Sequence, residues 1–154
     1  MPSSPILVRP ATAADAAAIV AFNVAMAMET EGLALDPAKI TPGVEGLFAH
    51  PQYGFYVVAE ADGQAAGGLM ITYEWSDWRN AVFWWIQSVY VLPAFRGQGV
   101  YRTLYASVKT MAQAAGNCCG FRLYVEKENT AAQAVYRKLG MQDSHYWMFE
   151  GPAD

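Results

Sequence analysis

The stretch VYVLPAFRGQGVYRTL, residues 89–104, decides the fold of this chain. It begins with β-prone residues, passes through a turn that contains Gly97 and Gly99, and continues into an amphipathic pattern. That pattern runs in steps of three and four through Val100, Leu104, Val108, Met111 and Ala115. The stretch therefore predicts a strand, a glycine turn and a helix, which Gly116 ends.

The turn between this strand and helix has the residue types of an anion site. Gly97 and Gly99 have no side chains, so backbone N–H groups can converge on an anion at the positive end of the helix dipole. A P-loop would need Gly-Lys-Ser/Thr, but Val100 and Tyr101 follow Gly99. A dinucleotide fingerprint would need a third glycine where Arg102 stands. The spacing favours a third kind of phosphate-binding turn.

The rest of the chain predicts a mixed α/β or α+β domain with one sheet covered by helices on both sides. Strands are expected at residues 6–9, 55–60, 66–73, 81–92, 121–125 and 146–150. Helices are expected at residues 12–28, around 44–48, at 100–115 and at 130–139, with a loop over 29–42. Simple alternation in the strand 81–92 puts Trp84, Ile86, Ser88 and Tyr90 on one face and Trp85, Gln87, Val89 and Val91 on the other.

Composition and charge narrow the function classes. With 154 residues, 54% hydrophobic and 16% charged, residues 1–154 are expected to form a single packed domain. The net charge of -4 argues against nucleic acid as a partner. The strongest apolar runs, 67–73 and 81–92, fall short of the ~20 residues of a membrane span, and residues 1–9 lack a signal-peptide pattern. The adjacent Cys118 and Cys119 favour neither a disulfide nor a metal site, so no metal and a cytoplasmic location are expected.

The turn and three further segments resemble the GNAT superfamily of acetyltransferases. Arg96-x-x-Gly99 after the strand 89–93 resembles motif A of that family, Gln/Arg-x-x-Gly-x-Gly/Ala. Segments 8–15, 123–129 and 132–141 match the family in order and spacing, so the resemblance covers essentially the whole chain. Tyr101 departs from the last Gly/Ala position, and its ring must point away from the ligand. The resemblance implies the GNAT fold, a single mostly antiparallel twisted sheet flanked by helices and splayed between its central strands.

The same resemblance implies acetyl-CoA as the acyl donor and a set of residues that bind it. The backbone of Val89, Tyr90 and Val91 is expected along the pantetheine arm. The pyrophosphate is expected at Arg96, Gly97, Gln98, Gly99, Val100, Tyr101 and Arg102. Asn129 is expected to contact the cofactor, and Tyr136 to act as the general acid that protonates the leaving thiolate. From the residues alone, Asn129 also reads as a helix cap, Tyr136 as a packed ring and the two arginines as solvated side chains.

The general base is not where many family members have it. A carboxylate usually stands about six residues before the proline that ends this strand, and here that residue is Gln87, which cannot take a proton. Glu29, Glu31, Glu74, Asp77 or an ordered water chain are the candidates. Acidic and aromatic residues in segments 28–31 and 73–78 favour a small cationic amine as acceptor, although solvated charges and core or dimer tryptophans would give the same pattern.

The function expected from this reading is N-acetyl transfer from acetyl-CoA to a primary amine by direct attack in a ternary complex. A peptide or protein amine is the alternative acceptor. A non-catalytic acyl-CoA-binding module is the alternative of another class, because Gln87 removes the customary acid. The expected partner is a small-molecule amine, with no nucleic acid and no membrane. Because many relatives dimerise and 14% of the residues are aromatic, a homodimer is compatible with the sequence.

Overall fold

The computed structural model describes residues 5–154 and divides the chain into two compact units, one ending at Tyr124 and the other comprising Val125–Asp154. The first four residues of the stretch 1–9, which is expected not to be a signal peptide, lie outside the described residues. A single domain over residues 1–154 stays a prediction. Each unit is described by itself below.

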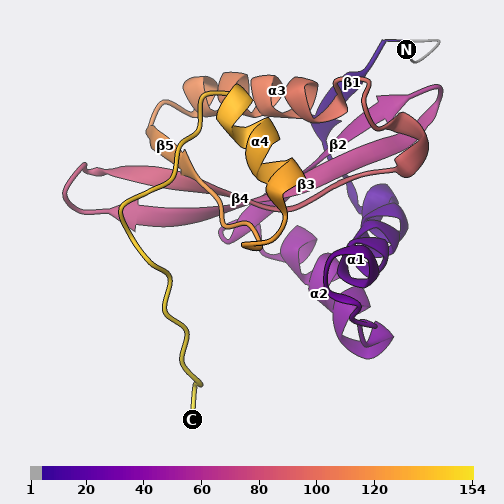
Figure 1. Cartoon of the computed structure of the whole chain (residues 1–154), viewed down its shortest axis with the longest axis horizontal. Helices are drawn as coiled ribbons and strands as arrows, with labels where there is room; N and C mark the ends of the chain where they lie inside the picture. The colour runs from indigo at the N-terminus through magenta and orange to yellow at the C-terminus, as the bar shows by residue number, and fades with distance from the viewer. Residues whose placement is uncertain (1–4) are drawn as a thin grey trace. The chain divides into compact units, whose positions relative to one another are not determined.

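The first unit is one sheet with helices on both faces (Figure 1). Its strands are β1 (Leu7–Pro10), β2 (Gly54–Ala61), β3 (Gln64–Ser76), β4 (Ala81–Val91) and β5 (Cys118–Arg122). They lie side by side in sequence order, antiparallel except for the parallel pair β4 and β5. Its helical elements are η1 (Ala13–Asp15), α1 (Ala16–Glu31), α2 (Pro37–Ala49), η2 (Pro93–Phe95) and α3 (Val100–Ala115). The expected mixed fold with a mostly antiparallel sheet is confirmed.

Helices α1 and α2 cover one face of the sheet. Ile19 of α1 and Val44 of α2 form a buried cluster with Tyr56 and Val58 of β2, and Met70 of β3 packs against it. Alternate residues of β2 and β3 therefore point to these helices, as a half-buried antiparallel sheet requires.

Helix α3 lies on the opposite face of the sheet (Figure 1). The Tyr105 ring of α3 lies 5.9 Å from Phe121 of β5, and Phe121 lies 6.4 Å from Trp84 of β4. Val100, Leu104 and Val108 are buried as predicted. The stripe then continues through Tyr105 and Ala112, which are buried, instead of through Met111 and Ala115.

Helix α1 belongs to a further apolar stretch, longer than the runs 67–73 and 81–92. Its stretch Ala13–Glu31, of 19 residues, could cross a membrane by length and composition alone. In the structure Ile19 and Phe22 are buried, and the Phe22 ring packs 5.7 Å from Tyr90 of β4. One side of this helix therefore packs against the sheet of the first unit.

Three expected elements differ from the structure. The predicted loop over 29–42 is wrong, because α2 already begins at Pro37, where Asp36 accepts a hydrogen bond from the Ala38 N–H at 2.9 Å. Pro favours the first helical position, and Pro42 removes only one backbone bond further on. Strand β5 begins at Cys118 instead of residue 121. The expected last strand, 146–150, is absent, since residues 141–154 form neither helix nor strand.

The second unit contains one helix, α4 (Thr130–Lys138). Asn129 caps it, because its Oδ1 accepts a hydrogen bond from the Ala132 N–H at 3.2 Å. The capping interpretation of Asn129 is thus realised, and an additional contact of Asn129 to the cofactor stays a prediction.

Candidate active site

Strand β4 carries a bulge just before the glycine turn. Tyr90 pairs with Gly68 and Gln87 with Met70, so Ser88 and Val89 together oppose the single residue Leu69. Ser88 has a φ of 53°, a left-handed conformation that is unusual for serine in a strand. The strands approach closely here, because a Cβ on Gly67 would come within 2.6 Å of the Tyr90 carbonyl oxygen. Bulges of this kind bend a strand and re-aim its side chains, often beside active sites.

The bulge corrects the predicted faces of β4. Simple alternation placed Tyr90 with Trp84 and Ile86, but the extra residue reverses the alternation after Gln87. Tyr90 instead faces α1, where its ring contacts Phe22. Gln87 lies on that same face, because its cross-strand partner Met70 packs in the α1–α2 core.

The sheet opens between β4 and β5. The two strands pair only from Val82 with Cys118 to Trp85 with Arg122. Beyond that point β4 continues to Val91, and among residues 5–154 no strand pairs with residues 86–91 on the side away from β3. This is the splay that the resemblance implied. The open backbone of Val89, Tyr90 and Val91 lies beside it.

The turn after β4 has the geometry of an anion cradle. Gly97 and Gly99 have φ angles of 76° and 81°, and a Cβ at either position would meet nothing within 4 Å. Gly99 is the N-cap of α3 and no side chain caps the helix, so N–H groups of its first turn remain for a ligand. Val100 is buried, so its contribution to a ligand is its backbone. An open space at an uncapped helix start fits the pyrophosphate of acetyl-CoA.

The side chains around the turn leave this space open. The Tyr101 ring packs along α3, 6.2 Å from Tyr105, and Gln98 donates from Nε2 to the Ala94 carbonyl at 3.1 Å. The Gln98 Oε1 is buried with no hydrogen-bond partner in the described part of the chain, an acceptor that a ligand donor could satisfy. Arg102 is exposed on the first turn of α3.

Arg96 connects the turn to the end of α1. Its Nε donates to the Val91 carbonyl at 2.9 Å, and its Nη2 donates to Glu29 Oε2 at 2.8 Å. The Tyr90 O–H donates to Glu29 Oε1 at 2.9 Å. The bonds from Arg96 and Tyr90 hold the pKa of Glu29 below its usual range, and burial with Glu29 as neighbour raises the pKa of Tyr90. A direct role of Arg96 at the phosphates stays a prediction, since here its charge balances Glu29.

A second carboxylate cluster lies on the same face of the sheet as Gln87. Glu74 Oε1 accepts a hydrogen bond from Trp85 Nε1 at 2.8 Å, and Arg122 Nη1 lies 2.9 Å and 3.0 Å from the two carboxylate oxygens. The Arg122 guanidinium also stacks 3.7 Å above the Phe83 ring. These donors, Trp85 first, hold the pKa of Glu74 below its usual range. Glu74 is therefore an oriented, ionised carboxylate near neutral pH.

The remaining acidic candidates lack such partners. Glu31 is exposed at the last position of α1, with no hydrogen bond or ion pair to its side chain among the described residues. Asp77 lies in the β3–β4 turn and accepts a hydrogen bond from the Trp78 N–H at 2.9 Å. Gln87 sits close to Thr72, whose Oγ1 lies 3.4 Å from Gln87 Oε1. The structure thus orients Glu29 and Glu74 and leaves Glu31 unconstrained, a distinction that the sequence did not make.

Tyr136 lies in the second unit, on the half-buried side of α4. Burial raises the pKa of its phenol. The phenol is therefore protonated at neutral pH, as a general acid must be, and its role stays a prediction.

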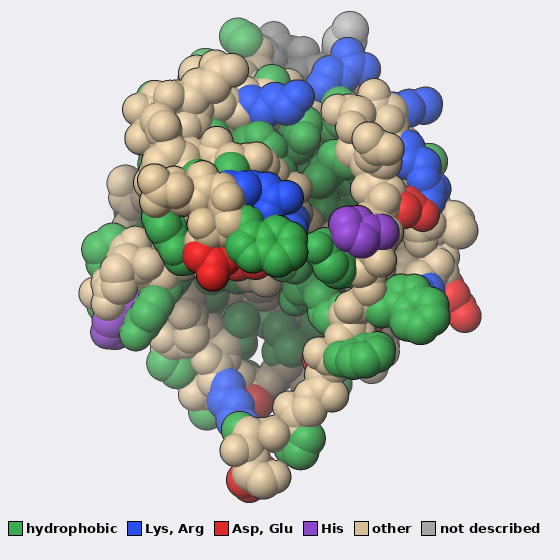
Figure 2. All heavy atoms as spheres, turned by 90° about the vertical axis from the view of Figure 1, so that its left-hand side faces the viewer, with side chains coloured by type: hydrophobic (Ala, Val, Ile, Leu, Met, Phe, Trp, Pro, Cys, Tyr) green, Lys and Arg blue, Asp and Glu red, His purple; other side chains and the backbone are tan. Residues whose placement is uncertain are grey.

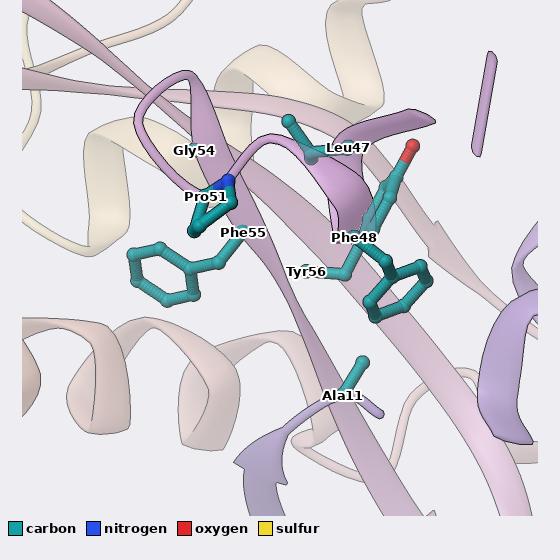
Figure 3. Close-up of a pocket in the computed structure, with 7 residues that line it drawn as sticks. All are labelled: Ala11, Leu47, Phe48, Pro51, Gly54, Phe55 and Tyr56. Carbon is teal, nitrogen blue, oxygen red and sulfur yellow. The ribbon is translucent and has the colours of Figure 1, made fainter. Parts of the chain in front are cut away.

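Two other features of the described residues bear on ligand binding. A pocket at the end of α2 is lined by Ala11, Leu47, Phe48, Pro51, Gly54, Phe55 and Tyr56 (Figure 3). None of these side chains carries a charge, so the pocket has no group that would form an ion pair with a phosphate or an ammonium. No three His, Cys, Asp or Glu side chains within residues 5–154 gather as a metal ion would require.

Sequence comparisons connect this site to known proteins. The model of the Acetyltransferase (GNAT) family matches residues 24–141, which include Glu29, the glycine turn and Tyr136. A thialysine N-ε-acetyltransferase of Mus musculus is 34% identical over 109 residues, covering 62% of each chain. The chain thus spans less than two thirds of that relative. An aminoglycoside N(6')-acetyltransferase type 1 of Salmonella typhimurium is 31% identical over 119 residues, 74% of this chain and 79% of the relative.

Comparison with solved structures also finds acetyltransferases. A possible acetyltransferase from Clostridium difficile 630 is 40% identical and matches with a TM-score of 0.90 over 98% of this chain and 99% of the other. The aminoglycoside acetyltransferase AAC(6')-Iy, solved with a CoA bisubstrate analogue, matches with a TM-score of 0.78 at 19% identity over 98% of this chain and all of the other. The latter likeness shows the fold alone.

Proposed function

Because the chain belongs to the Acetyltransferase (GNAT) family, we propose that it transfers an acetyl group from acetyl-CoA to a primary amine by direct attack in a ternary complex. The observation that carries the proposal is the uncapped start of α3 at Gly99, directly after the bulged and splayed strand β4. Together they offer an anion cradle and an open strand edge in one continuous segment.

The donor would bind along this segment. Bound acetyl-CoA supplies an acetyl group activated as a thioester. The N–H groups of residues 97–102 would hold its pyrophosphate, with Arg102 adding positive charge. The open backbone of Val89 to Val91 would hydrogen-bond the pantetheine arm, which orients the thioester beside the face that carries Gln87 and Tyr90. The phenol of Tyr136, kept protonated by its raised pKa, would donate the proton to the leaving thiolate.

The acceptor we propose is a small cationic amine. Glu29 and Glu74 are both held ionised by their partners, so they attract an ammonium group at neutral pH. A carboxylate with a lowered pKa is a weak general base, so these groups would bind and orient the ammonium while a chain of ordered water carries its proton to bulk solvent, which leaves the neutral amine to attack the thioester. The exposed Trp75 and Trp78 could bind the cation over a ring face at ~0.5 to 2 kcal/mol. The names of the mouse and Salmonella relatives, which give amine acceptors, support this choice.

Two alternatives remain within the proposal. A peptide or protein amine would use the same chemistry with a larger acceptor. A non-catalytic acyl-CoA-binding module would use the cradle alone, and Gln87 in place of the usual carboxylate is the observation that favours it. A cytoplasmic location is also proposed, supported by two free cysteines on β5.

Two measurements test the proposal. The first is calorimetric titration with acetyl-CoA of the wild type, of Gly99→Glu and of Gly116→Glu. The two glycines have similar φ angles, 81° and 84°, at opposite ends of α3, so the second variant matches the backbone strain of the first. We expect Gly99→Glu alone to abolish saturable binding. A folded Gly99→Glu variant with wild-type affinity would remove the site.

The second measurement is release of free CoA thiol with a panel of polyamines, lysine-like amino acids, aromatic amines and peptides. Turnover that is fastest with a small cationic amine supports the proposed function. Turnover only with peptides favours the peptide alternative. Binding of acetyl-CoA without thiol release from any acceptor favours the non-catalytic module.

A further inference from the structure

Three side chains join the end of α1 to the strand and the turn that would hold the donor. Glu29 of α1 accepts one hydrogen bond at each carboxylate oxygen, at Oε1 from Tyr90 of β4 and at Oε2 from Arg96 of the turn. The Arg96 guanidinium also lies 5.4 Å from the centre of the Tyr90 ring. The two donors to Glu29 differ in how firmly the protein holds them.

The Tyr90 side chain is fixed in place. It is 5% exposed, and its ring packs against Phe22 of α1. Burial and the neighbouring Glu29 carboxylate raise the pKa of the Tyr90 phenol, so the phenol stays a hydrogen-bond donor at neutral pH. The bond from Tyr90 to Glu29 Oε1 therefore does not depend on where the Arg96 guanidinium points.

The Arg96 side chain can change its partner. It is 46% exposed, and an ion pair in such a setting stabilises a protein little. Arg96 lies three residues before Gly99, and its Nη1 makes no hydrogen bond to any of residues 5–154. The bond from its Nε to the Val91 carbonyl keeps the guanidinium beside the turn. A pyrophosphate in the turn bears more negative charge than one carboxylate and suits a guanidinium fork equally well.

The second ion pair on this face of the sheet lies away from the turn. Glu74 and Arg122 stand beside Phe83 and Trp85, in the first half of β4, whereas the glycine turn follows the end of β4. Figure 2 looks onto the β3–β4 hairpin at that end of the sheet and shows acidic and basic side chains near one another at the surface. Of the two pairs, the one with Arg96 therefore stands between a carboxylate and the anion cradle.

We propose that Arg96 exchanges between two anions, pairing with Glu29 in the ligand-free protein and with the pyrophosphate when acetyl-CoA binds, so that donor binding frees Glu29 Oε2 for a cationic acceptor. This exchange rests on the proposed function, whose donor and acceptor sites it connects. Tyr90 keeps Glu29 in place, and the ammonium group takes the position that the guanidinium leaves. With both substrates bound, every one of these charges has a partner of opposite sign.

The exchange makes the two substrates strengthen each other's binding. A donor that binds alone has to take Arg96 from Glu29, and an ammonium that binds alone has to displace Arg96 from the same oxygen. When both bind, the Glu29–Arg96 pair is broken only once, so the coupling equals the strength of this pair and is the same for either substrate. For an exposed ion pair this is about 2- to 5-fold in each Kd.

Calorimetric titration with CoA measures the competition for Arg96 without an acceptor, because the free thiol of CoA carries no acetyl group. Glu29→Gln removes the competing charge, so we expect this variant to bind CoA about 2- to 5-fold more tightly than the wild type. Glu45→Gln removes an exposed carboxylate of α2 and should leave the affinity unchanged. In an Arg96→Gln background, Glu29→Gln should no longer tighten binding.

The outcomes separate the exchange from the proposed function. A wild type that does not bind CoA would refute the proposed function, and the exchange with it. If the wild type binds CoA but Glu29→Gln binds it no more tightly, the exchange is wrong while the donor site stands. The exchange is also wrong if Glu29→Gln tightens binding equally with and without Arg96, because the effect would then be long-range repulsion alone.

NMR titration of the side-chain carboxyl carbons tests the exchange in the wild type, where no substitution disturbs the fold. Arg96 is the largest cause of the lowered pKa of Glu29, so saturating CoA should raise this pKa as the guanidinium leaves. Asp15 is the internal control, since its partner Arg9 lies on β1, away from β4 in the sheet, and its pKa should not move. An unchanged pKa of Glu29 in the CoA-bound protein would overturn the proposal.

Discussion

Replacing Glu29 by glutamine tests the acceptor site most directly. Glu29 accepts hydrogen bonds from Tyr90 at 2.9 Å and from Arg96 at 2.8 Å, and the substitution keeps the size of the side chain while removing its charge. The Glu29 and Arg96 side chains are 41% and 46% exposed, so solvent screens their ion pair. Exposed pairs of this kind contribute about 0.2 to 1 kcal/mol. The melting temperature should therefore fall by no more than a few degrees.

The effect on a cationic acceptor should be larger. Two unit charges about 4 Å apart interact by about 1 kcal/mol in water and about 4 kcal/mol at the effective dielectric of a protein surface. An ammonium group near the partly exposed Glu29 should lie between these limits, at about 1 to 2 kcal/mol. This corresponds to a roughly 5- to 30-fold loss in kcat/KM. Because the pKa of Glu29 is lowered, its charge is present at neutral pH and is lost only as the pH falls through that lowered value.

The assay compares kcat/KM for a cationic amine and for an amine that is neutral at the assay pH. Glu45→Gln is the matched control, since Glu45 is an exposed carboxylate on α2 that takes no part in the proposed site. We expect Glu29→Gln to lose efficiency only with the cationic amine and Glu45→Gln to lose none. An equal loss with both amines would show a purely structural role for Glu29. Wild-type efficiency with the cation would refute the electrostatic reasoning.

Three further outcomes can be measured. Tyr136→Phe removes the proposed general acid and should lower kcat by ~10²-fold, while calorimetry shows unchanged acetyl-CoA affinity. Full activity of this variant would show that the Tyr136 ring only packs in the protein. Ser88→Val places a β-branched residue at a φ of 53° and should lower the free energy of unfolding by about 1 to 3 kcal/mol and weaken acetyl-CoA binding, whereas Ser88→Gly should do neither. Asp15→Asn should lower the free energy of unfolding by about 1 to 2 kcal/mol at neutral pH, because Arg9 donates to both oxygens of Asp15 at 2.8 and 3.0 Å. Arg9 holds the pKa of Asp15 below its usual range, so this stabilisation is present above about pH 4 and is lost as the pH falls through the lowered pKa. A difference in the free energy of unfolding between variant and wild type that persists in acid would contradict the role of this ion pair.

Much of the fold followed from local patterns in the sequence. The strands expected at 55–60 and 66–73 form β2 and β3, which the Asp62-Gly63 turn joins, and the positions Val100, Leu104 and Val108 form the buried side of α3. Such features depend on residues close together in the chain, where turn preferences and the helical period act directly. The glycine turn was found for the same reason.

What the sequence did not reveal depends on contacts between distant segments. The two-residue alternation of side chains in a strand cannot reveal the bulge at Ser88. This bulge alone turns Tyr90 toward α1. The bonds of Glu29 to Arg96 and of Glu74 to Arg122 join residues 67 and 48 positions apart, so spacing could not rank these acids above Glu31. The strand expected at 146–150 has the composition of a strand, but pairing also needs a partner edge.

With acetyl-CoA bound at the start of α3 as proposed, the missing cap would make the stability of this protein depend on its ligand. Gly99 leaves the first N–H groups of the helix without a side-chain acceptor, so an anion bound there completes the helix. Any molecule that binds only the folded chain stabilises it, by about 2.7 kcal/mol at 100 times its Kd. Amide exchange at residues 100–103 should therefore slow when acetyl-CoA is added.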